Sequence, residues 1–427
     1  MCGVQSCNSW QVASGLPSGK ASPVTFVSYI ALIISLLALP VASSRLTLPR
    51  LAFLFGLLII HLAATILSYN YAQSHIADSA LYYYDLWHFA NKPWWSLGTV
   101  FVIHIAQALK GYLGASYLDC FMMFQAIGFW GIMILMRTFE ELHEKILAPP
   151  STVSKYLLFL PSIHFWTASI GKDAILFFAM ALCTWSILNV SRRIMRLGFA
   201  LLLMVLVRAH IAVLVVASLA IAATLYRGLS LGRRVTLLLP ALLALAVLGA
   251  VVQSSIGIDL SDPGSVATFL EERTDVIAGA AGNTSLNGQP FTVRLVSLLF
   301  RPMFIDARNA LGLVASMENV FFVLIYAYCL IRWREVVELY KKVYFIRFAL
   351  VLTLSLMVLL AIVNYNVGLG LRQRTMFLPL LLSIFVAIWA FRQRLKDMHA
   401  PRQAGAPVHP RIARSAVAGT LTRAPPA

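Results

Sequence analysis

Runs of about 20 apolar residues recur along most of this chain, and they restrict its fold more than any other feature. A helix of that length crosses a bilayer core of about 30 Å, and a spanning segment must satisfy its backbone hydrogen bonds internally. The sequence therefore predicts an all-α, polytopic integral membrane helical bundle with about eleven transmembrane helices. The predicted spans are residues 24–43, 51–67, 117–136, 156–170, 174–190, 197–207, 211–226, 235–253, 311–331, 343–363 and 376–391.

Composition and cysteine spacing exclude several other classes. Charged residues make up 12% of the chain and hydrophobic residues 60%, whereas a soluble domain carries about 25% charged residues. The five cysteines are scattered and form neither a C-x-x-C pair nor a cluster with histidine. We therefore expect no disulfide framework, no metal site, no cofactor and no nucleic-acid partner.

Lysine and arginine are concentrated in alternate connections, and this asymmetry orients the predicted spans, because cytoplasmic loops carry an excess of both residues. With the N-terminus outside, the basic connections fall on one inner side: 44–50, 137–155, 191–196, 227–234, 332–342 and the tail from Arg392. The predicted organisation is a short periplasmic N-terminal segment (1–23), a transmembrane helical domain (24–391) with outer loops 68–116 and 254–310, and a disordered cytoplasmic tail (392–427).

Two regions depart from simple spans. Segment 97–113 carries His104, Gln107 and Lys110 at helical spacing, which predicts an amphipathic helix lying in the outer interface. Segments 197–207 and 211–226 are short and flank a charged point at Arg208 and His210. We interpret them as the two halves of a hairpin or of a broken helix pair.

The predicted outer side holds more cations than the positive-inside rule favours, most of them at helix ends: Lys172, Arg208, Arg294, Arg301, Arg308, Arg372 and Arg374. An ionisable residue at membrane depth is costly unless it is paired, so it is a functional candidate. Arginine suits planar, bidentate binding of phosphate or carboxylate. The alternatives are snorkelling to phospholipid head groups and structural pairing with Asp or Glu.

Carboxylates on the same predicted side are few. Asp78 and Asp85 flank a run of tyrosines, with two tryptophans soon after, which suits sugar binding and equally suits an interfacial aromatic belt. A carboxylate there is a candidate general base toward a hydroxyl. Asp173 follows Lys172 at a helix start, where it complements the helix dipole. Glu318, inside a predicted span, requires a cation, from Arg301, Arg308 or the Arg372–Arg374 pair.

The order of these elements carries a family resemblance. The elements are an outer loop with Asp78 and Tyr82 to Asp85, an aromatic-rich segment leading into a span, a helix start reading Ala168-Ser-Ile-Gly-Lys172-Asp173, an Arg301-Pro302 pair, a Glu318-Asn319 pair one span in, and Gly368-x-x-x-Arg372-x-Arg374 before the last span. This order resembles the bacterial O-antigen and exopolysaccharide polymerases of the Wzy type, particularly the EpsG-like branch, over roughly residues 69–391.

The resemblance implies a bundle of the C-type glycosyltransferase class in the bacterial inner membrane. The implied reaction joins an oligosaccharide on undecaprenyl diphosphate to another lipid-linked unit, alongside other polysaccharide export and assembly proteins. Arginines stabilise the leaving diphosphate, so no metal is required. The candidates for taking the acceptor proton are Asp85, His210 and Glu318. The candidates for substrate binding are Asp78, Lys172, Arg208, Arg301, Arg308, Arg372 and Arg374.

Two other functions stay open. One is a flippase or transporter of lipid-linked sugar, in which the arginines would line a path; such proteins often show internal repeats, and none is evident here. The other is a membrane glycosyltransferase that uses a polyprenyl-phosphate sugar. Those enzymes usually place a paired acidic motif close behind the first span, whereas Asp78 and Asp85 follow the second predicted span and are not adjacent.

The Arg372–Arg374 pair carries the most specific hypothesis. Gly368 and Gly370 permit a tight turn, and in an extended turn alternate side chains share a face. Both arginines would then clamp one diphosphate, with Arg301 as a third contact. The rival is that one of them pairs with Glu318 and only the other meets the lipid.

The orientation can be tested by labelling cysteines introduced into the predicted outer loop 254–310. Because this loop is predicted to be periplasmic, we expect a membrane-impermeant thiol reagent to label it in cells with an intact inner membrane. Labelling only after that membrane is permeabilised would contradict the predicted topology.

Overall fold

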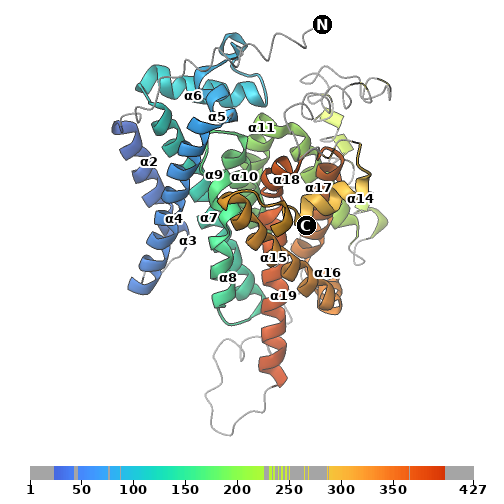
Figure 1. Ribbon diagram of the computed structural model, residues 1–427. Helices are drawn as coiled ribbons and strands as arrows, with labels where there is room; N and C mark the ends of the chain where they lie inside the picture. The colour runs from blue at the N-terminus through green and yellow to red at the C-terminus, as the bar shows by residue number, and fades with distance from the viewer. Residues whose placement is uncertain are drawn as a thin grey trace.

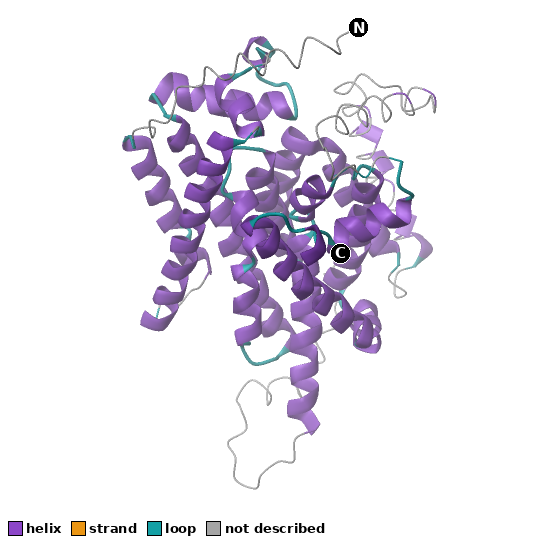
Figure 2. Ribbon diagram, viewed as in Figure 1, coloured by secondary structure: helices purple, strands orange, loops and turns teal. Residues whose placement is uncertain are grey.

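The structure is a computed structural model that describes residues 24–42, 47–75, 77–86, 88–225, 288–364 and 366–399, with scattered positions between 230 and 286. Within this part the regular structure is helical and no β-strand occurs (Figure 2). Short 3₁₀ helices are η2 (Phe89–Asn91), η3 (Leu157–Phe159) and η5 (Phe304–Asp306). The α-helices are α2 (Phe26–Leu37), α3 (Leu39–Ala42), α4 (Leu48–Ser74), α5 (Asp78–Tyr84), α6 (Thr99–Leu113), α7 (Tyr117–Ile146), α8 (Thr152–Tyr156), α9 (Pro161–Thr167), α10 (Lys172–Ile187), α11 (Val190–Thr224), α14 (Phe291–Phe300), α15 (Ala310–Ile331), α16 (Trp333–Lys342), α17 (Tyr344–Ile362), α18 (Val367–Arg374) and α19 (Leu378–His399).

Six helices of the described part are long and apolar enough to cross a membrane: α4, α7, α11, α15, α17 and α19. They support the prediction of a helical membrane protein but do not reproduce the predicted count of about eleven spans. Predicted span 24–43 is divided between α2 and α3, and span 156–170 is broken where Pro161 starts α9. α10 has only 16 residues. Most of predicted span 235–253 lies outside the described residues.

The predicted boundaries shift at the C-terminal end. α19 continues to His399, so the first residues of the predicted tail 392–427 are helical rather than irregular. Helix α14 lies inside the predicted outer loop 254–310. Residues 1–23 and 400–427, and nearly all of 254–287, lie outside the described residues.

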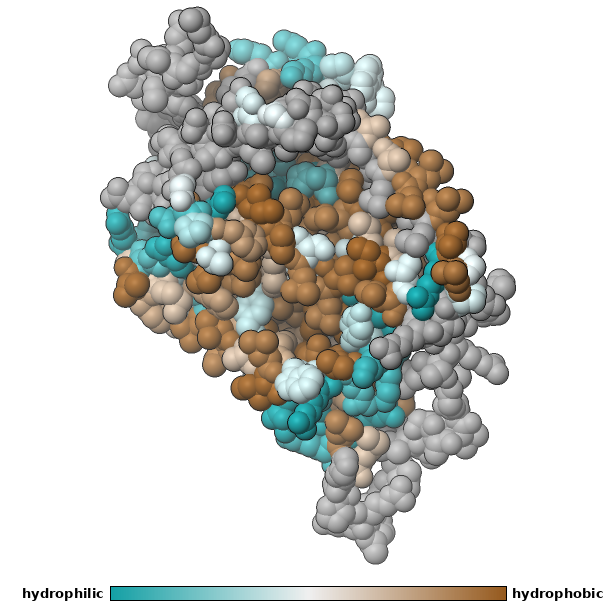
Figure 3. All heavy atoms as spheres, turned by 90° about the vertical axis from the view of Figure 1, so that its right-hand side faces the viewer, coloured by the Kyte–Doolittle hydropathy of each residue, from teal (hydrophilic) through white to brown (hydrophobic). Residues whose placement is uncertain are grey.

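The surface around the middle of the bundle is hydrophobic, as expected for contact with lipid. Figure 3 shows a face on which hydrophobic residues fill the centre and hydrophilic residues gather toward the two ends. Large apolar side chains such as Ile33, Ile59 and Leu324 are exposed on α2, α4 and α15. Exposed apolar residues cost little in lipid, so this belt supports membrane embedding.

Helix α7 lies at the centre of the packing and contacts α2, α4, α9, α10 and α19 (Figure 1). Two glycines allow its neighbours to approach closely. A Cβ on Gly128 would lie 2.2 Å from the backbone oxygen of Thr167 in α9, and one on Gly131 would lie 2.7 Å from the ring of Phe177 in α10. Small residues have this role at helix contacts in membranes, where close packing replaces the hydrophobic effect.

Helix α11 turns back on itself at Arg208, whose backbone is not helical (φ −151°, ψ 77°). Before the turn, Arg193 donates to the Trp185 oxygen near the end of α10, whereas Arg208 lies at the start of α10. After the turn, Leu219 accepts a hydrogen bond from Tyr344 at the start of α17. The last residues of α17 lead to α18, whose Arg372 lies beside Arg208 at Asp173. The start of α17, and with it Leu219, therefore lies at the opposite end of the bundle, where Arg193 lies. The two arms of α11 thus run antiparallel, as expected for a hairpin.

Helices α5 and α6 pack together at one end of the bundle (Figure 1). The side-chain amide of Gln107 donates to the carbonyls of Tyr82 and Tyr83, and Lys110 lies 4.8 Å from the centre of the Tyr83 ring. With 15 residues, α6 is about 22 Å long, which is too short to cross a bilayer core. The interfacial position of segment 97–113 stays a prediction.

Close packing at Gly128 can be tested with Gly128→Ala, with Gly56→Ala as a matched control. The added methyl at position 128 would clash with the Thr167 backbone, whereas nothing lies within 4 Å of a Cβ at Gly56 in α4. We expect Gly128→Ala to cost about 1–3 kcal/mol, and Gly56→Ala to cost nothing. Thermal unfolding in detergent measures both, and equal midpoints for the two variants would contradict the packing.

Candidate functional site

A buried carboxylate, Asp173, organises the site at the start of α10. Its side chain is 3% exposed and lies between two guanidinium groups. Arg372 of α18 donates from Nε to one carboxylate oxygen, and Arg208 at the α11 turn donates to the other at 3.4 Å. Asp173 also lies in the first turn of a helix, where the dipole favours a negative charge.

Arg372 links this buried carboxylate to a second, more accessible one. Its Nη1 donates to Asp78 at the start of α5, whose side chain is 52% exposed. Burial alone would raise the pKa of Asp78, but the charge and hydrogen bond of Arg372 outweigh it and hold that pKa below its ordinary value. Asp78 is therefore ionised at neutral pH, and its pairing with Arg372 weakens only as the pH falls through this lowered pKa.

Lys172 completes a group that we call the charge cluster: Asp78, Lys172, Asp173, Arg208 and Arg372. Burial, and then repulsion from Arg208 and Arg372, lowers the pKa of Lys172 to about 7. Within the described part Lys172 forms no ion pair shorter than 4 Å. With Lys172 protonated, three cations meet two carboxylates, so the cluster carries one excess positive charge. Such a cluster is suited to bind an anion.

Two neighbours shape the edge of the charge cluster. Tyr82 is buried beside Asp78, and burial together with that carboxylate raises the pKa of its phenol, so it stays protonated. A Cβ on Gly171 would lie 3.6 Å from the Tyr82 ring and 3.7 Å from Arg372. His210, two residues beyond Arg208, has an exposed side chain close enough to Arg208 and Lys172 to feel their charges.

Arg374 lies in a different environment, so the predicted clamp of Arg372 and Arg374 on one diphosphate is wrong. Segment Val367–Arg374 is helical rather than extended, because the Asn366 side chain caps it by accepting from the Leu369 amide at 2.7 Å. Residues two apart on a helix diverge by about 200°. Arg374 is 1% exposed and donates to Asn319 at 2.5 Å and to the Leu299 carbonyl at 3.1 Å.

Glu318 is adjacent to this second network but does not bond directly to an arginine. Its carboxylate accepts from the Ser162 hydroxyl at 2.7 Å and from the Ser162 amide at 3.2 Å. The rival hypothesis, in which one arginine of the pair forms an ion pair with Glu318, is therefore wrong as a direct contact. Arg374 reaches the neighbouring Asn319 and contributes its charge to Glu318 from there.

The remaining predicted site residues lie outside the charge cluster. Arg301 forms a two-bond ion pair with Asp306, at 3.0 and 2.5 Å, so it is already engaged and is not a third contact beside Arg372. Arg308 is exposed. Asp85 has a left-handed backbone (φ 49°), and its carboxylate accepts from the amides of Phe89 and Ala90 at 2.7 and 2.9 Å. Asp85 therefore stabilises a loop here.

Sequence reasoning missed the central position of Asp173 and the part played by Ser162. Asp173 had a sufficient local explanation at a helix start, which hid its long-range partners. The small number of carboxylates on this side could have indicated the role of Asp173, because each carboxylate then has to pair with more than one cation. For Ser162 no comparable signal exists, since serines are common in apolar helices.

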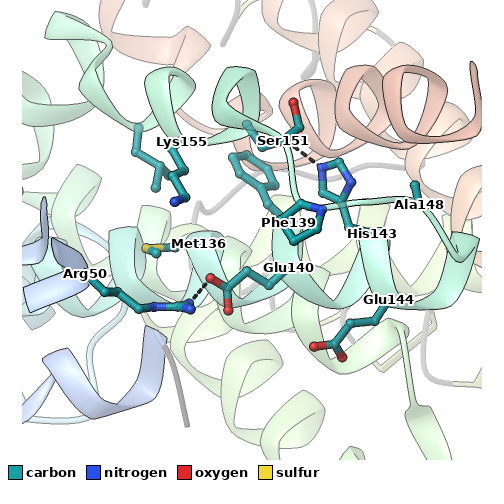
Figure 4. A pocket seen from close by; sticks show the side chains of 12 residues that line it. Arg50, Met136, Phe139, Glu140, His143, Glu144, Ala148, Ser151 and Lys155 are labelled. Atoms are coloured by element: carbon teal, nitrogen blue, oxygen red, sulfur yellow. Dashed lines mark hydrogen bonds and ion pairs between the residues drawn. The ribbon is translucent and has the colours of Figure 1, made fainter. Parts of the chain in front are cut away.

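A separate cavity of about 200 Å³ lies between α7, α8 and the start of α4 (Figure 4). Arg50 and Glu140 form an ion pair at its wall, and Lys155 and Glu144 add one charge of each sign. The cavity contains none of the predicted site residues. Its charges are balanced, unlike those of the charge cluster.

Because Asp173 is buried and Asp78 is half exposed, we expect their replacement to lower the stability of the protein by different amounts. Asp173→Asn leaves Arg208 without its counter-ion and leaves Arg372 with only the half-exposed Asp78, so we expect a loss of about 3–5 kcal/mol. Asp78→Asn removes a half-exposed partner and is expected to cost less than about 1 kcal/mol. Thermal unfolding of the purified variants measures both effects, and an equal loss would show that Asp173 is not the buried anchor.

Comparison with protein-family models, curated proteins and solved structures finds no match for this chain.

Proposed function

We propose that this chain is a glycosyltransferase of the bacterial inner membrane that polymerises undecaprenyl-diphosphate-linked oligosaccharide repeat units into a surface or extracellular polysaccharide. The reaction would take place on the periplasmic face and need no metal ion. The observation that carries the proposal is the charge cluster, in which Arg208, Arg372 and Lys172 surround two carboxylates and, when Lys172 is protonated, leave one positive charge uncompensated.

The chemistry of the proposed reaction requires such a cluster. The acceptor hydroxyl attacks the anomeric carbon, the bond from that carbon to the diphosphate oxygen breaks, and the lipid diphosphate departs with the electron pair. Fixed cations lower the barrier because they stabilise the charge that develops on the leaving group. Asp173 and Asp78 hold Arg372 in place before substrate arrives, so the site needs little reorganisation.

The acceptor proton needs a base near the cluster, and among the predicted candidates we favour His210. Its side chain is exposed and close to Arg208 and Lys172, whereas Asp85 is occupied by two backbone amides. Glu318 is buried and bonded to Ser162.

The proposal includes a periplasmic N-terminus, a cytoplasmic C-terminus and a bundle of the C-type glycosyltransferase class with about eleven spans. The contacts support the orientation, because the end opposite the charge cluster collects the basic residues of the predicted inner loops. There, Arg193 pairs with Glu141, Arg392 pairs with Glu335, and Arg394 donates to the Ile146 carbonyl.

Deletion of the gene in its bacterium tests the proposed reaction. We expect long-chain polysaccharide to disappear while single lipid-linked repeat units accumulate on the periplasmic face. Arg372→Lys keeps the charge but loses the planar fork, and it should lower polymer yield at least about 100-fold with the protein still inserted. Arg334→Lys, at the other end of the bundle, is the control. Repeat units that accumulate only on the cytoplasmic face would instead indicate a flippase.

Lys172 gives the proposed site a specific pH dependence. Its pKa of about 7 means that the ammonium is charged below this pH and largely neutral above it. Binding of undecaprenyl diphosphate to the purified protein should therefore weaken between about pH 6 and about pH 8 relative to Lys172→Arg, whose charge is fixed. Ionisation of the ligand itself affects both proteins equally. Parallel pH profiles would contradict a role for Lys172 in binding.

A further inference from the structure

The cavity between α7, α8 and the start of α4 lies where helices end, away from the charge cluster (Figure 4). Its lining includes Arg50, two residues after the start of α4, and Lys155 in α8. Leu48 and Tyr156, close to them in sequence, are 81% and 67% exposed. Exposed apolar and aromatic residues next to lysine and arginine at helix ends are typical of the interface between lipid tails and water. The cavity therefore lies at the depth of lipid head groups.

The cavity has a positive side and a negative side (Figure 4). Arg50 and Lys155 lie on one side, and Glu144, near the end of α7, lies on the other. Glu140 lies between them and pairs with Arg50. The lining charges balance in number but are separated in space, and this arrangement fits a ligand that carries one charge of each sign.

Both sides retain bonding capacity for a ligand. Nε of Arg50 is buried without an acceptor in the described part of the chain. Lys155 forms no ion pair among the described residues and lies 5.8 Å from the centre of the Phe53 ring. The cation that pairs with Glu144 there is Arg137, at 3.9 Å, which is longer than a hydrogen bond. Because a buried donor without an acceptor is destabilising, an anionic oxygen beside Arg50 would stabilise the protein.

The volume and the charges together narrow the ligand. At about 200 Å³, the cavity is smaller than the roughly 300–1,000 Å³ of sites for drug-sized ligands, so it suits a lipid head group and not an oligosaccharide. A phosphodiester supplies the negative charge for Arg50 and Lys155. A primary ammonium donates three hydrogen bonds, as lysine does, and so suits Glu144. A trimethylammonium group has no N–H to donate, and an anionic head group without an amine would bring a like charge to the Glu144 carboxylate.

We propose that this cavity binds the phosphoethanolamine head group of a membrane phospholipid, with its phosphate at Arg50 and Lys155 and its ammonium at Glu144. The Arg50–Glu140 pair fixes the wall between the two charged sides. Since the acyl chains stay in the bilayer, the lipid remains anchored while its head group joins the start of α4 to α7 and α8. The site is independent of any reaction at the charge cluster, which lies at the opposite end of the bundle (Figure 1).

Native mass spectrometry of the purified full chain tests the proposal. The delipidated protein is mixed in detergent with equal amounts of phosphatidylethanolamine, phosphatidylcholine and phosphatidylglycerol. We expect the protein to retain at least about tenfold more phosphatidylethanolamine than either other lipid, which is the effect of one charge-assisted hydrogen bond. Equal retention of the three lipids, or a preference for phosphatidylglycerol, would overturn the proposal.

Three single variants at the same end of the bundle assign the preference to the cavity. Glu144→Gln should lower retention of phosphatidylethanolamine to that of phosphatidylglycerol, and Lys155→Gln should lower retention of both lipids. Lys145→Gln is the control, because Lys145 neighbours Glu144 and is 44% exposed but does not line the cavity. The replaced side chains are exposed, so we expect all three variants to fold. An unchanged lipid preference in Glu144→Gln, or an equal loss in Lys145→Gln, would contradict the assignment.

Soluble glycerophosphoethanolamine separates a lipid site from a site for a small soluble molecule. It carries the same head group without acyl chains, so we expect it to displace bound phosphatidylethanolamine only at an excess of about 100-fold or more. Displacement at equal concentration would show that the bilayer contributes nothing, and the lipid would then not be the ligand.

Discussion

The arrangement of this protein depends on the cost of a charge in an apolar interior. Asp173 is almost completely buried, and it is tolerable there only because Arg208 and Arg372 approach it from two other elements. In meeting this requirement, the carboxylate fixes the turn of α11 and the position of α18 against the start of α10. Arg372 then extends the connection to Asp78, so that α5 is joined to the same point.

The same requirement explains the polar contacts elsewhere in the bundle. Arg374 is buried against Asn319 and two backbone carbonyls, and Glu318 is bonded to Ser162. At the opposite end, Glu141 accepts from both Arg193 and the Trp185 indole. Between these polar points the helices pack through apolar side chains and small residues, of which Gly128 allows the closest backbone approach.

The charge cluster differs from these other networks in two respects that bear on function. Its carboxylates do not balance its cations, and one of them, Asp78, is half exposed, so a ligand in the aqueous phase has access to it. The Arg374 network, by contrast, is closed and serves packing.

The length and spacing of apolar residues were sufficient to predict an all-helical membrane protein, because these are local properties and a bilayer permits few solutions. Sequence also located Asp78, Lys172, Arg208 and Arg372, since charges are rare enough in such a chain to stand out. Only tertiary structure decided which charge meets which, because the partners are distant in the chain. It also decided that Asn366 caps a helix, so that Arg372 and Arg374 point to different sites. Such contacts depend on how helices pack, which no local pattern specifies.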